Sequence, residues 1–185
     1  MYKLQKGCIL DQTKDWEDNM TVVTKNKKTN INWSGKHLTS LEDSPKEVDG
    51  GFDCSDNDLT SLQGAPEKVG GGFNCFFNKL TSLQGSPEKV GGEFVCHHNE
   101  LITLQGGPKE VNGTFSCSVN NLTSLEGSPE KIGKDFYCHD NKLTSLSGCP
   151  KEVGLDFVCY GNPKTFGEKE IRSVCNVKGR VIVTH

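Results

Sequence analysis

Residues 80–100 read LTSLQGSPEKVGGEFVCHHNE, and close copies of this stretch precede and follow it at a spacing of 21 residues. Aligned at that spacing, the copies place leucine, proline, phenylalanine, cysteine and asparagine each in its own column. A fixed period of this size predicts a solenoid, in which each unit buries its apolar side only by stacking against its neighbours. The columns are Leu38, Leu59, Leu80, Leu101, Leu122 and Leu143; Pro45, Pro66, Pro87, Pro108, Pro129 and Pro150; Phe52, Phe73, Phe94, Phe115, Phe136 and Phe157; Cys54, Cys75, Cys96, Cys117, Cys138 and Cys159; and Asn57, Asn78, Asn99, Asn120, Asn141 and Asn162.

The chain has 185 residues and a formal net charge of -3, with lysines and glutamates interspersed. This mixture leaves no basic stripe that could track phosphates, so nucleic acid is not an expected partner. Charges interrupt the apolar residues of the N-terminal stretch MYKLQKGCILDQTKDWEDN, and no long apolar run follows. We therefore expect no secretory signal and no membrane span, and a chain that works in the cytoplasm.

The Phe-x-Cys sequences have the spacing of two side chains that face the same side of a strand. We expect both to point inward, with the strands of successive turns stacked in parallel. The following asparagine ends the strand, and its amide is expected to bond backbone groups left unpaired at the bend. The valine or isoleucine before the glycines returns an apolar side chain from the opposite wall, and Gly-x-Pro leaves no room for a full helix. The outer wall is therefore predicted to be extended or turn-like.

Nine cysteines raise the alternatives of disulfides or a zinc site. Six of them follow the 21-residue period, so their sulfurs would form a buried row at the strand spacing of roughly 4.8 Å. Such a row does not converge on a metal as four tetrahedral ligands do. We predict free, buried thiols in a reducing compartment. The other three, Cys8, Cys149 and Cys175, have spacings that match no metal motif.

Residues 1–30 lack the repeat and are predicted to form an N-terminal cap over the first strand of the sheet. An antiparallel strand through the valines at 22–23 is one arrangement for this cap. Ile31 and Trp33 stand where phenylalanine and cysteine occur one period later, so the solenoid itself is predicted over residues 31–162.

Residues 163–185 depart from the period and are predicted to form a C-terminal cap. Thr165 and Glu168 have the spacing of a capping box, which favours a short amphipathic helix after it. A strand over residues 181–183 is expected to pair with the last turn of the solenoid. The apolar face of the helix is predicted to be Ile171, Val174 and Cys175.

The stretch FNCFFNKLTSL, residues 73–83, resembles the leucine-rich repeat signature L-x-L-x-x-N-x-L, with phenylalanine and cysteine at the two strand positions. Asn-x-Leu-Thr-Ser-Leu followed by proline is similar to the short bacterial subclass, which occurs in secreted effectors of pathogens, and similar repeats occur in bacteriophage proteins. The resemblance covers residues 31–162 and implies a solenoid with a parallel sheet on its concave face. The unit is one residue longer than the commonest bacterial one, has Val-Gly-Gly in place of a leucine, and carries no attached ubiquitin-ligase domain. The effector activity is therefore not carried over.

In leucine-rich repeats the variable strand residues form an open face, which the resemblance places here between phenylalanine and cysteine and at the two positions after cysteine. This face is polar at its start and aromatic beyond it. It consists of Asp53, Ser55 and Asp56; Asn74, Phe76 and Phe77; Val95, His97 and His98; Ser116, Ser118 and Val119; Tyr137, His139 and Asp140; and Val158, Tyr160 and Gly161.

Aromatic residues concentrate on this predicted face. Six of the nine phenylalanines form the buried column, and two of the other three are Phe76 and Phe77. Exposed aromatic patches are usually retained for binding, although one of this pair could instead fold under a cap or pair across a dimer. The predicted partner-binding residues are Phe76, Phe77, Val95, His97, His98, Val119, Tyr137, His139 and Tyr160.

His97 and His98 raise the alternative of a zinc site, with His139 as the only further histidine nearby. Adjacent strand residues point to opposite sides, and His139 lies two turns away, roughly 10 Å by strand spacing. We therefore expect no metal and no other cofactor. No acid, base or nucleophile is set up by a partner residue, so we also expect no enzyme activity.

Two functions of different class remain open. The first is a scaffold that binds a protein partner through the aromatic face, possible for a phage or bacterial product that inhibits or recruits a host protein. The second is a structural module whose face forms a homodimer. Both hypotheses place the function on the same face of the solenoid.

Overall fold

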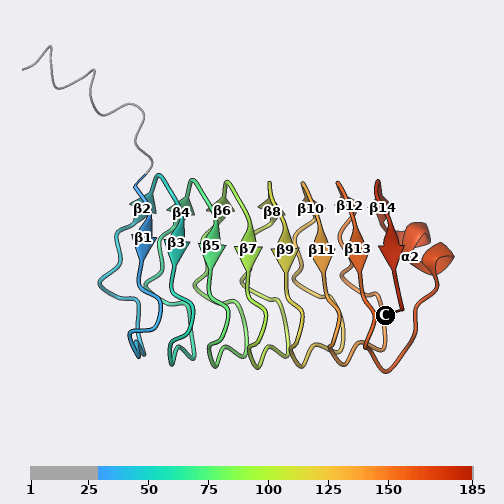
Figure 1. Cartoon of the computed structure of the whole chain (residues 1–185), viewed down its shortest axis with the longest axis horizontal. Helices are drawn as coiled ribbons and strands as arrows, with labels where there is room; N and C mark the ends of the chain where they lie inside the picture. Colours follow the sequence, from blue (N-terminus) through green and yellow to red (C-terminus); the bar gives the residue numbers. More distant parts are fainter. Residues whose placement is uncertain (1–28, 185) are drawn as a thin grey trace, which may run out of the picture.

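The structure is a computed structural model that describes residues 29–184. Within this range the chain is a β-solenoid, and Figure 1 shows its turns stacked in one row. The predicted solenoid with parallel sheets is confirmed. The N-terminal cap predicted over residues 1–30, with its strand at 22–23, lies outside the described residues except for residues 29 and 30.

Each turn contributes one short strand to each of two parallel sheets. We call them the front sheet, which contains the Phe-x-Cys strands, and the rear sheet, whose strands precede the glycines. The front sheet consists of β1 (Ile31–Asn32), β3 (Phe52–Asp53), β5 (Phe73–Asn74), β7 (Phe94–Val95), β9 (Phe115–Ser116), β11 (Phe136–Tyr137), β13 (Phe157–Val158) and β15 (Val181–Ile182). The rear sheet consists of β2 (Glu47–Val48), β4 (Lys68–Val69), β6 (Lys89–Val90), β8 (Glu110–Val111), β10 (Lys131–Ile132), β12 (Glu152–Val153) and β14 (Asn176–Val177).

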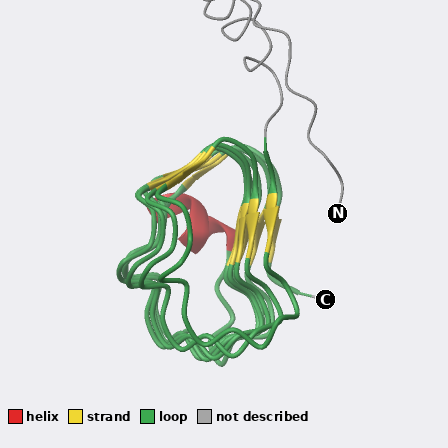
Figure 2. Cartoon of the chain, turned by 90° about the vertical axis from the view of Figure 1, so that its left-hand side faces the viewer, coloured by secondary structure: helices red, strands yellow, loops and turns green. Residues whose placement is uncertain are grey.

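The two sheets form neighbouring walls of the cross-section, and loops close the rest of it (Figure 2). The outer wall, predicted to be extended or turn-like, thus contains a second hydrogen-bonded sheet. Its strands end in the column of valines and isoleucines that we predicted to point inward. Val90, Val111 and Ile132 of this column are buried. The predicted register also holds at the first turn, because Ile31 pairs with Phe52.

The core is made of the periodic columns. The first five phenylalanines of the column each pair with the phenylalanine of the next turn, and the rings of Phe73 and Phe94 stack with centroids 5.3 Å apart. All six cysteines of the column are buried and free, as predicted. Because the same apolar shape recurs in every turn, one turn's side chains fill the space left by the next.

The asparagine column joins consecutive turns through side-chain hydrogen bonds. Asn120 Oδ1 accepts a hydrogen bond from Leu101 N at 2.9 Å. Asn120 Nδ2 donates to Cys96 O and to Cys117 O at 3.1 Å each, so one amide contacts backbone from both turns. The predicted asparagine ladder is therefore present.

The last turn continues both sheets although the period changes. β15 pairs with β13, as predicted for the strand at 181–183, and Phe157 pairs with Val181 at a spacing of 24 residues. The helix α2 (Glu168–Val174) lies at this end of the stack, shown in red at the end of the row in Figure 1. Its Arg172 donates hydrogen bonds to the carbonyl oxygens of Val177 and Gly179, which belong to the last turn.

The capping box predicted for α2 is wrong. Gly167 occupies the N-cap position, and no side chain caps the helix there. Ile171 and Cys175 are buried as predicted, whereas Val174 is 51% exposed. The seven-residue helix is therefore held by packing and by the bonds of Arg172 more than by its own N-terminal signal.

Among residues 29–184, the longest apolar helix falls short of what is needed to cross a lipid bilayer.

Candidate interaction surface

One position of the front wall, repeated every 21 residues, lies in the left-handed region of φ; His37 in the first turn is a further left-handed residue outside this column. This left-handed column immediately precedes the asparagine column. Glycine occupies it at both ends, with φ of 63° at Gly35 and 67° at Gly161. The residues between them have side chains and φ values of 49° to 53°: Asp56, Phe77, His98, Val119 and Asp140.

The left-handed backbone brings neighbouring side chains together beyond the strand ends. His98 lies past the end of β7, and its φ of 52° turns its ring towards His97. The two imidazoles contact each other through Nδ1 atoms 2.8 Å apart, so one ring donates the shared proton and the other accepts it. The expectation that these adjacent side chains point to opposite sides is therefore wrong, because it assumed strand geometry for both.

Phe76, Phe77, His97 and His98 form one ring cluster, which we call the Phe–His cluster. The Phe76 and His97 rings stack with centroids 4.9 Å apart, and the Phe77 and His98 centroids are 4.5 Å apart. Partial burial, followed by the charges of His98 and His139, lowers the pKa of His97 below its usual 6.5. The neutral imidazole is therefore favoured at neutral pH.

Tyr137, His139 and Tyr160 form a second group, which we call the Tyr–His cluster. The His139 and Tyr160 rings stack with centroids 4.6 Å apart, and Tyr137 approaches His139 edge-on at 6.2 Å. His139 Nδ1 lies 2.8 Å from Asp140 Oδ2, so the carboxylate accepts a hydrogen bond from the imidazole N–H. Asp140 is again a left-handed residue, and the geometry repeats that of His97 and His98 with an acid in place of the second imidazole.

A turn of small side chains separates the two clusters. Ser116 and Ser118 are buried, with their Oγ atoms 3.4 Å apart, and Val119 occupies the left-handed column beside them. Val95, also predicted for the face, is half-buried on β7. The predicted binding residues thus share one face, where the ring contacts of residues 29–184 fall into two groups.

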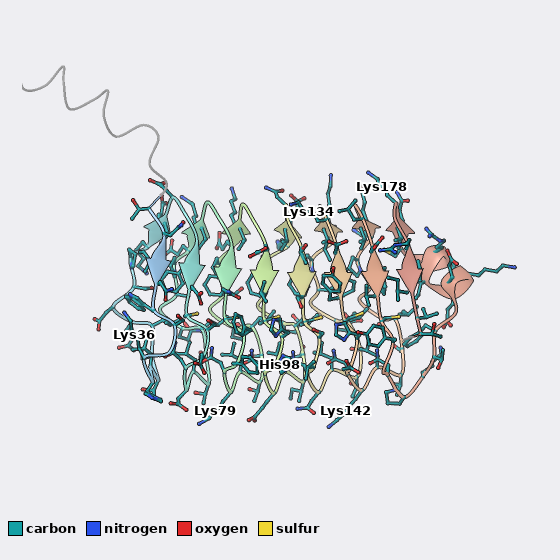
Figure 3. All side chains as sticks on the ribbon, viewed as in Figure 1. Lys36, Lys79, His98, Lys134, Lys142 and Lys178 are labelled. Atoms are coloured by element: carbon teal, nitrogen blue, oxygen red, sulfur yellow. The ribbon has the colours of Figure 1, made fainter. Side chains whose placement is uncertain are left out.

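Four large apolar side chains are exposed among residues 29–184, and Phe77, which is 49% exposed, is the one on the predicted face. Figure 3 shows His98 near the middle of the stack. The labelled lysines lie towards the edges of the same view, with Lys79 and Lys142 at one edge and Lys134 and Lys178 at the other. Two of these lysines are paired with acids, since Lys79 Nζ lies 2.7 Å from Asp58 Oδ1 and Lys178 Nζ lies 2.7 Å from Glu152 Oε1.

A hollow of about 600 Å³ adjoins the Phe–His cluster. Its acidic side comes from Asp53 and Asp56, and its apolar side from Phe76 and Phe77. Asp53 Oδ1 accepts hydrogen bonds from Ser55 N at 3.0 Å and Ser55 Oγ at 2.6 Å. No lysine, arginine or histidine within residues 29–184 forms an ion pair with either aspartate.

The partner-binding residues predicted from the sequence do not include these acidic residues. Asp53 and Asp56 looked like a polar beginning of the face, and only the stack places them against the phenylalanines of the next turn. Nearby Asn74 carries the one buried side-chain oxygen in residues 29–184 that lacks a hydrogen-bond partner. A sequence signal for Asp56 did exist, since aspartate tolerates left-handed backbone and aligns with Gly35 and Gly161.

The side chains of this surface supply several kinds of contact. Within residues 29–184 no three side chains of the metal-binding types converge on one point. The rings supply apolar contact area, the imidazoles supply donors and acceptors, and the aspartates supply negative charge.

Comparison of the chain with models of known protein families found no match, and comparison with curated protein sequences found none either.

Proposed function

We propose that this protein is a non-catalytic scaffold that binds a protein partner through the Phe–His and Tyr–His clusters. The left-handed column is the observation that carries the proposal. Left-handed backbone costs a residue with a side chain about 1 to 2 kcal/mol, whereas glycine adopts it freely. Phe77, His98 and Val119 nevertheless occupy positions where Gly35 and Gly161 stand at the ends.

Strained residues of this kind concentrate at functional sites. Phe77 has a left-handed backbone and is 49% exposed. Burial of its ring within the chain is therefore incomplete and offsets only part of the free energy that the strained backbone costs. Aromatic side chains are enriched in protein interfaces, where a few of them supply most of the binding energy. The rings that flank Phe77 give it fixed neighbours and a defined orientation.

The hollow beside the Phe–His cluster favours a partner that presents a basic side chain. An arginine there would reach the carboxylates of Asp53 and Asp56 while its guanidinium stacks on Phe76 or Phe77. The same carboxylates would repel phosphate groups, which argues against nucleic acid. Neither aspartate forms an ion pair within residues 29–184, so both carboxylates are available to a basic side chain of the partner.

The proposal includes the family, the cellular compartment and the effect on the partner. The leucine and asparagine columns support a relationship to leucine-rich repeats of the short bacterial and bacteriophage type. On that resemblance, the scaffold would act in the cytoplasm of a host cell and would inhibit or recruit a host protein. The buried, unbridged cysteine column is compatible with a reducing compartment.

The test is partner capture with two variants of one residue. Phe77→Ala and Phe77→Gly both remove the ring, and each is expected to weaken a captured complex by about 2 kcal/mol, roughly 30-fold in Kd. The free energy of unfolding of Phe77→Gly should also be higher than that of Phe77→Ala, because glycine adopts the left-handed backbone without strain. Weak binding by the more stable variant would therefore not be explained by unfolding.

Lys131→Ala on the rear sheet is the matched control, because Lys131 is exposed on the other wall. Unchanged affinity in both Phe77 variants, with loss of binding in Lys131→Ala, would refute the proposed face. Homodimerisation is the competing hypothesis, and the exposure of Phe77 is compatible with it. Light scattering over a range of concentrations distinguishes the two, since a dimer built on this face should dissociate in Phe77→Gly.

A further inference from the structure

One position in the corner between the two sheets has almost no room for a side chain. A Cβ built on Gly91 would lie 2.4 Å from Gly70 O, and one built on Gly133 would lie 2.1 Å from Asn112 O. Both distances are far inside van der Waals contact. Asn112 occupies this same position in the turn between them, so its Cβ faces Gly91 of the preceding turn.

The rear sheet is open at the step where Asn112 meets that turn. At the neighbouring steps, Gly91 N bonds Val69 O and Gly133 N bonds Val111 O, both at 2.8 Å. The corresponding bond from Asn112 N to Val90 O is not formed.

One further backbone hydrogen bond and one strand residue pair are missing at the same step. Glu88 N bonds Glu67 O at 3.0 Å and Glu130 N bonds Lys109 O at 2.8 Å, but Lys109 N does not bond Glu88 O. β6 and β8 pair only at Val90 and Val111, whereas the other strand pairs of the rear sheet share two residue pairs.

The opening is confined to a short segment. Ser86 Oγ bonds Gly106 O at 2.8 Å on one side of it, and Gly113 N bonds Gly92 O at 2.9 Å on the other. A hollow of about 720 Å³ lies there, lined by residues of β6 and β8 and of the loops beside them. The glycines of adjacent turns are thus still joined at the corner, and the gap lies between residues 88–91 and 109–112.

Side chains of opposite charge face each other across the gap without pairing. Glu88 stands opposite Lys109, and Lys89 opposite Glu110, but neither pair forms an ion pair. Lys151 Nζ and Glu130 Oε2 form an ion pair at 2.7 Å on this wall, but Lys109 and Glu130 do not pair although their step is bonded. The missing ion pairs therefore do not distinguish the open step, whereas the Cβ of Asn112 does.

The front sheet is intact at the same step. Phe94 N bonds Thr114 O at 2.9 Å and Cys96 N bonds Ser116 O at 2.8 Å. With one wall spread and the other bonded, we expect the later turns to tilt relative to the earlier ones. The open step lies between the turns that carry the Phe–His cluster and those that carry the Tyr–His cluster.

We propose that Asn112 is a steric wedge, a positioning residue that sets the angle between the two aromatic clusters. The wedge itself needs no partner, and only its consequence for binding rests on the proposed function. Lys178 occupies the same position in the last described turn and still donates to Val153 O at 3.0 Å. No described turn stacks beyond it, so that turn adjusts as a whole, whereas Asn112 is held between stacked neighbours.

The test compares Asn112→Gly with Asn112→Ala in the free protein. Glycine removes the Cβ and should close the step, slowing amide hydrogen exchange at residues 109 and 112 by about tenfold or more. Alanine keeps the Cβ and should exchange as the wild type does. If glycine leaves both amides unprotected, or if alanine closes the step as glycine does, the wedge is refuted.

Residual dipolar couplings of the front-sheet amides measure the tilt directly. In Asn112→Gly, the orientation of β3 and β5 relative to β11 and β13 should change, while Asn112→Ala should match the wild type. Identical couplings in all three proteins would overturn the positioning role even if exchange slows. None of these measurements uses a partner, so their failure is separate from failure of the Phe77 capture experiment.

Discussion

Two columns that adjoin each other in every turn behave in opposite ways. From Asn57 to Asn162 the asparagine column has the same residue, and each side chain bonds backbone of its own and the preceding turn, as Asn120 does. The left-handed column one residue earlier changes from turn to turn, and Val119 occupies it with a φ of 52°. Residue identity thus recurs where the side chain connects turns.

The left-handed column shows the opposite behaviour. Its backbone is uniform, with φ between 49° and 67° from Gly35 to Gly161, yet its side chains are not. A uniform backbone that glycine would satisfy does not explain phenylalanine, histidine or valine there. The proposed binding function rests on these variable side chains.

The largest expected effect belongs to the recurring columns. Phe115→Ala removes a ring that is fully buried between the phenylalanines of two neighbouring turns. We expect a loss of about 3 to 5 kcal/mol in the free energy of unfolding, as for other buried phenylalanines. Urea titration measures it, with exposed Thr123→Ala as a control that should change stability by less than about 0.5 kcal/mol. A loss below about 1 kcal/mol for Phe115→Ala would contradict the assigned core.

The second effect isolates the asparagine bonds. Asn120→Ala leaves Leu101 N without its only hydrogen-bond partner, which should cost about 1 to 3 kcal/mol. Cys96 O and Cys117 O lose one donor each but keep a second, from Asn99 and Asn141. Asn121→Ala is the matched control, because Asn121 bonds the preceding turn through its backbone N–H, at 2.9 Å from Leu101 O. Equal losses in the two variants would show that the Asn120 side chain does not hold the turns together.

The smallest effect is a reversal of the usual order of alanine and glycine. At the left-handed position, Val119→Gly should be about 1 kcal/mol more stable than Val119→Ala, because only alanine keeps the strained Cβ. At Val95, which lies in β7, alanine should instead be more stable than glycine by about 0.5 to 1 kcal/mol. Thermal or urea unfolding of the four variants would show the reversal, and the same order at both positions would remove the argument from strain.

Much of the fold follows from the period. The inward phenylalanines and cysteines, the asparagine ladder and the pairing of Ile31 with Phe52 were all predicted from spacing. The capping box predicted at Thr165 was wrong, because the N-terminus of α2 is determined by the packing of the helix against the last turn. The second sheet was foreseen only as an extended wall, because two residues per turn carry little periodic signal.

The candidate site was predicted in membership but not in arrangement. Phe76, Phe77, His97 and His98 were assigned to one face, yet alternation along a strand separated the two histidines that the structure joins at 2.8 Å. The cause is that β7 ends at Val95 and His98 has a left-handed φ, so neither histidine follows the alternation of a strand. The hollow next to Asp53 was also missed, because it forms between consecutive turns.

The sequence by itself determined the period, the buried columns and the set of residues that vary on the front wall. These properties depend on which residue recurs every 21 positions, and the printed chain contains that information. Only the tertiary structure decided the left-handed column, the division of the rings into two clusters and the open step at Asn112. They depend on how closely one turn approaches the next, where the space for a single Cβ separates a bonded step from an open one.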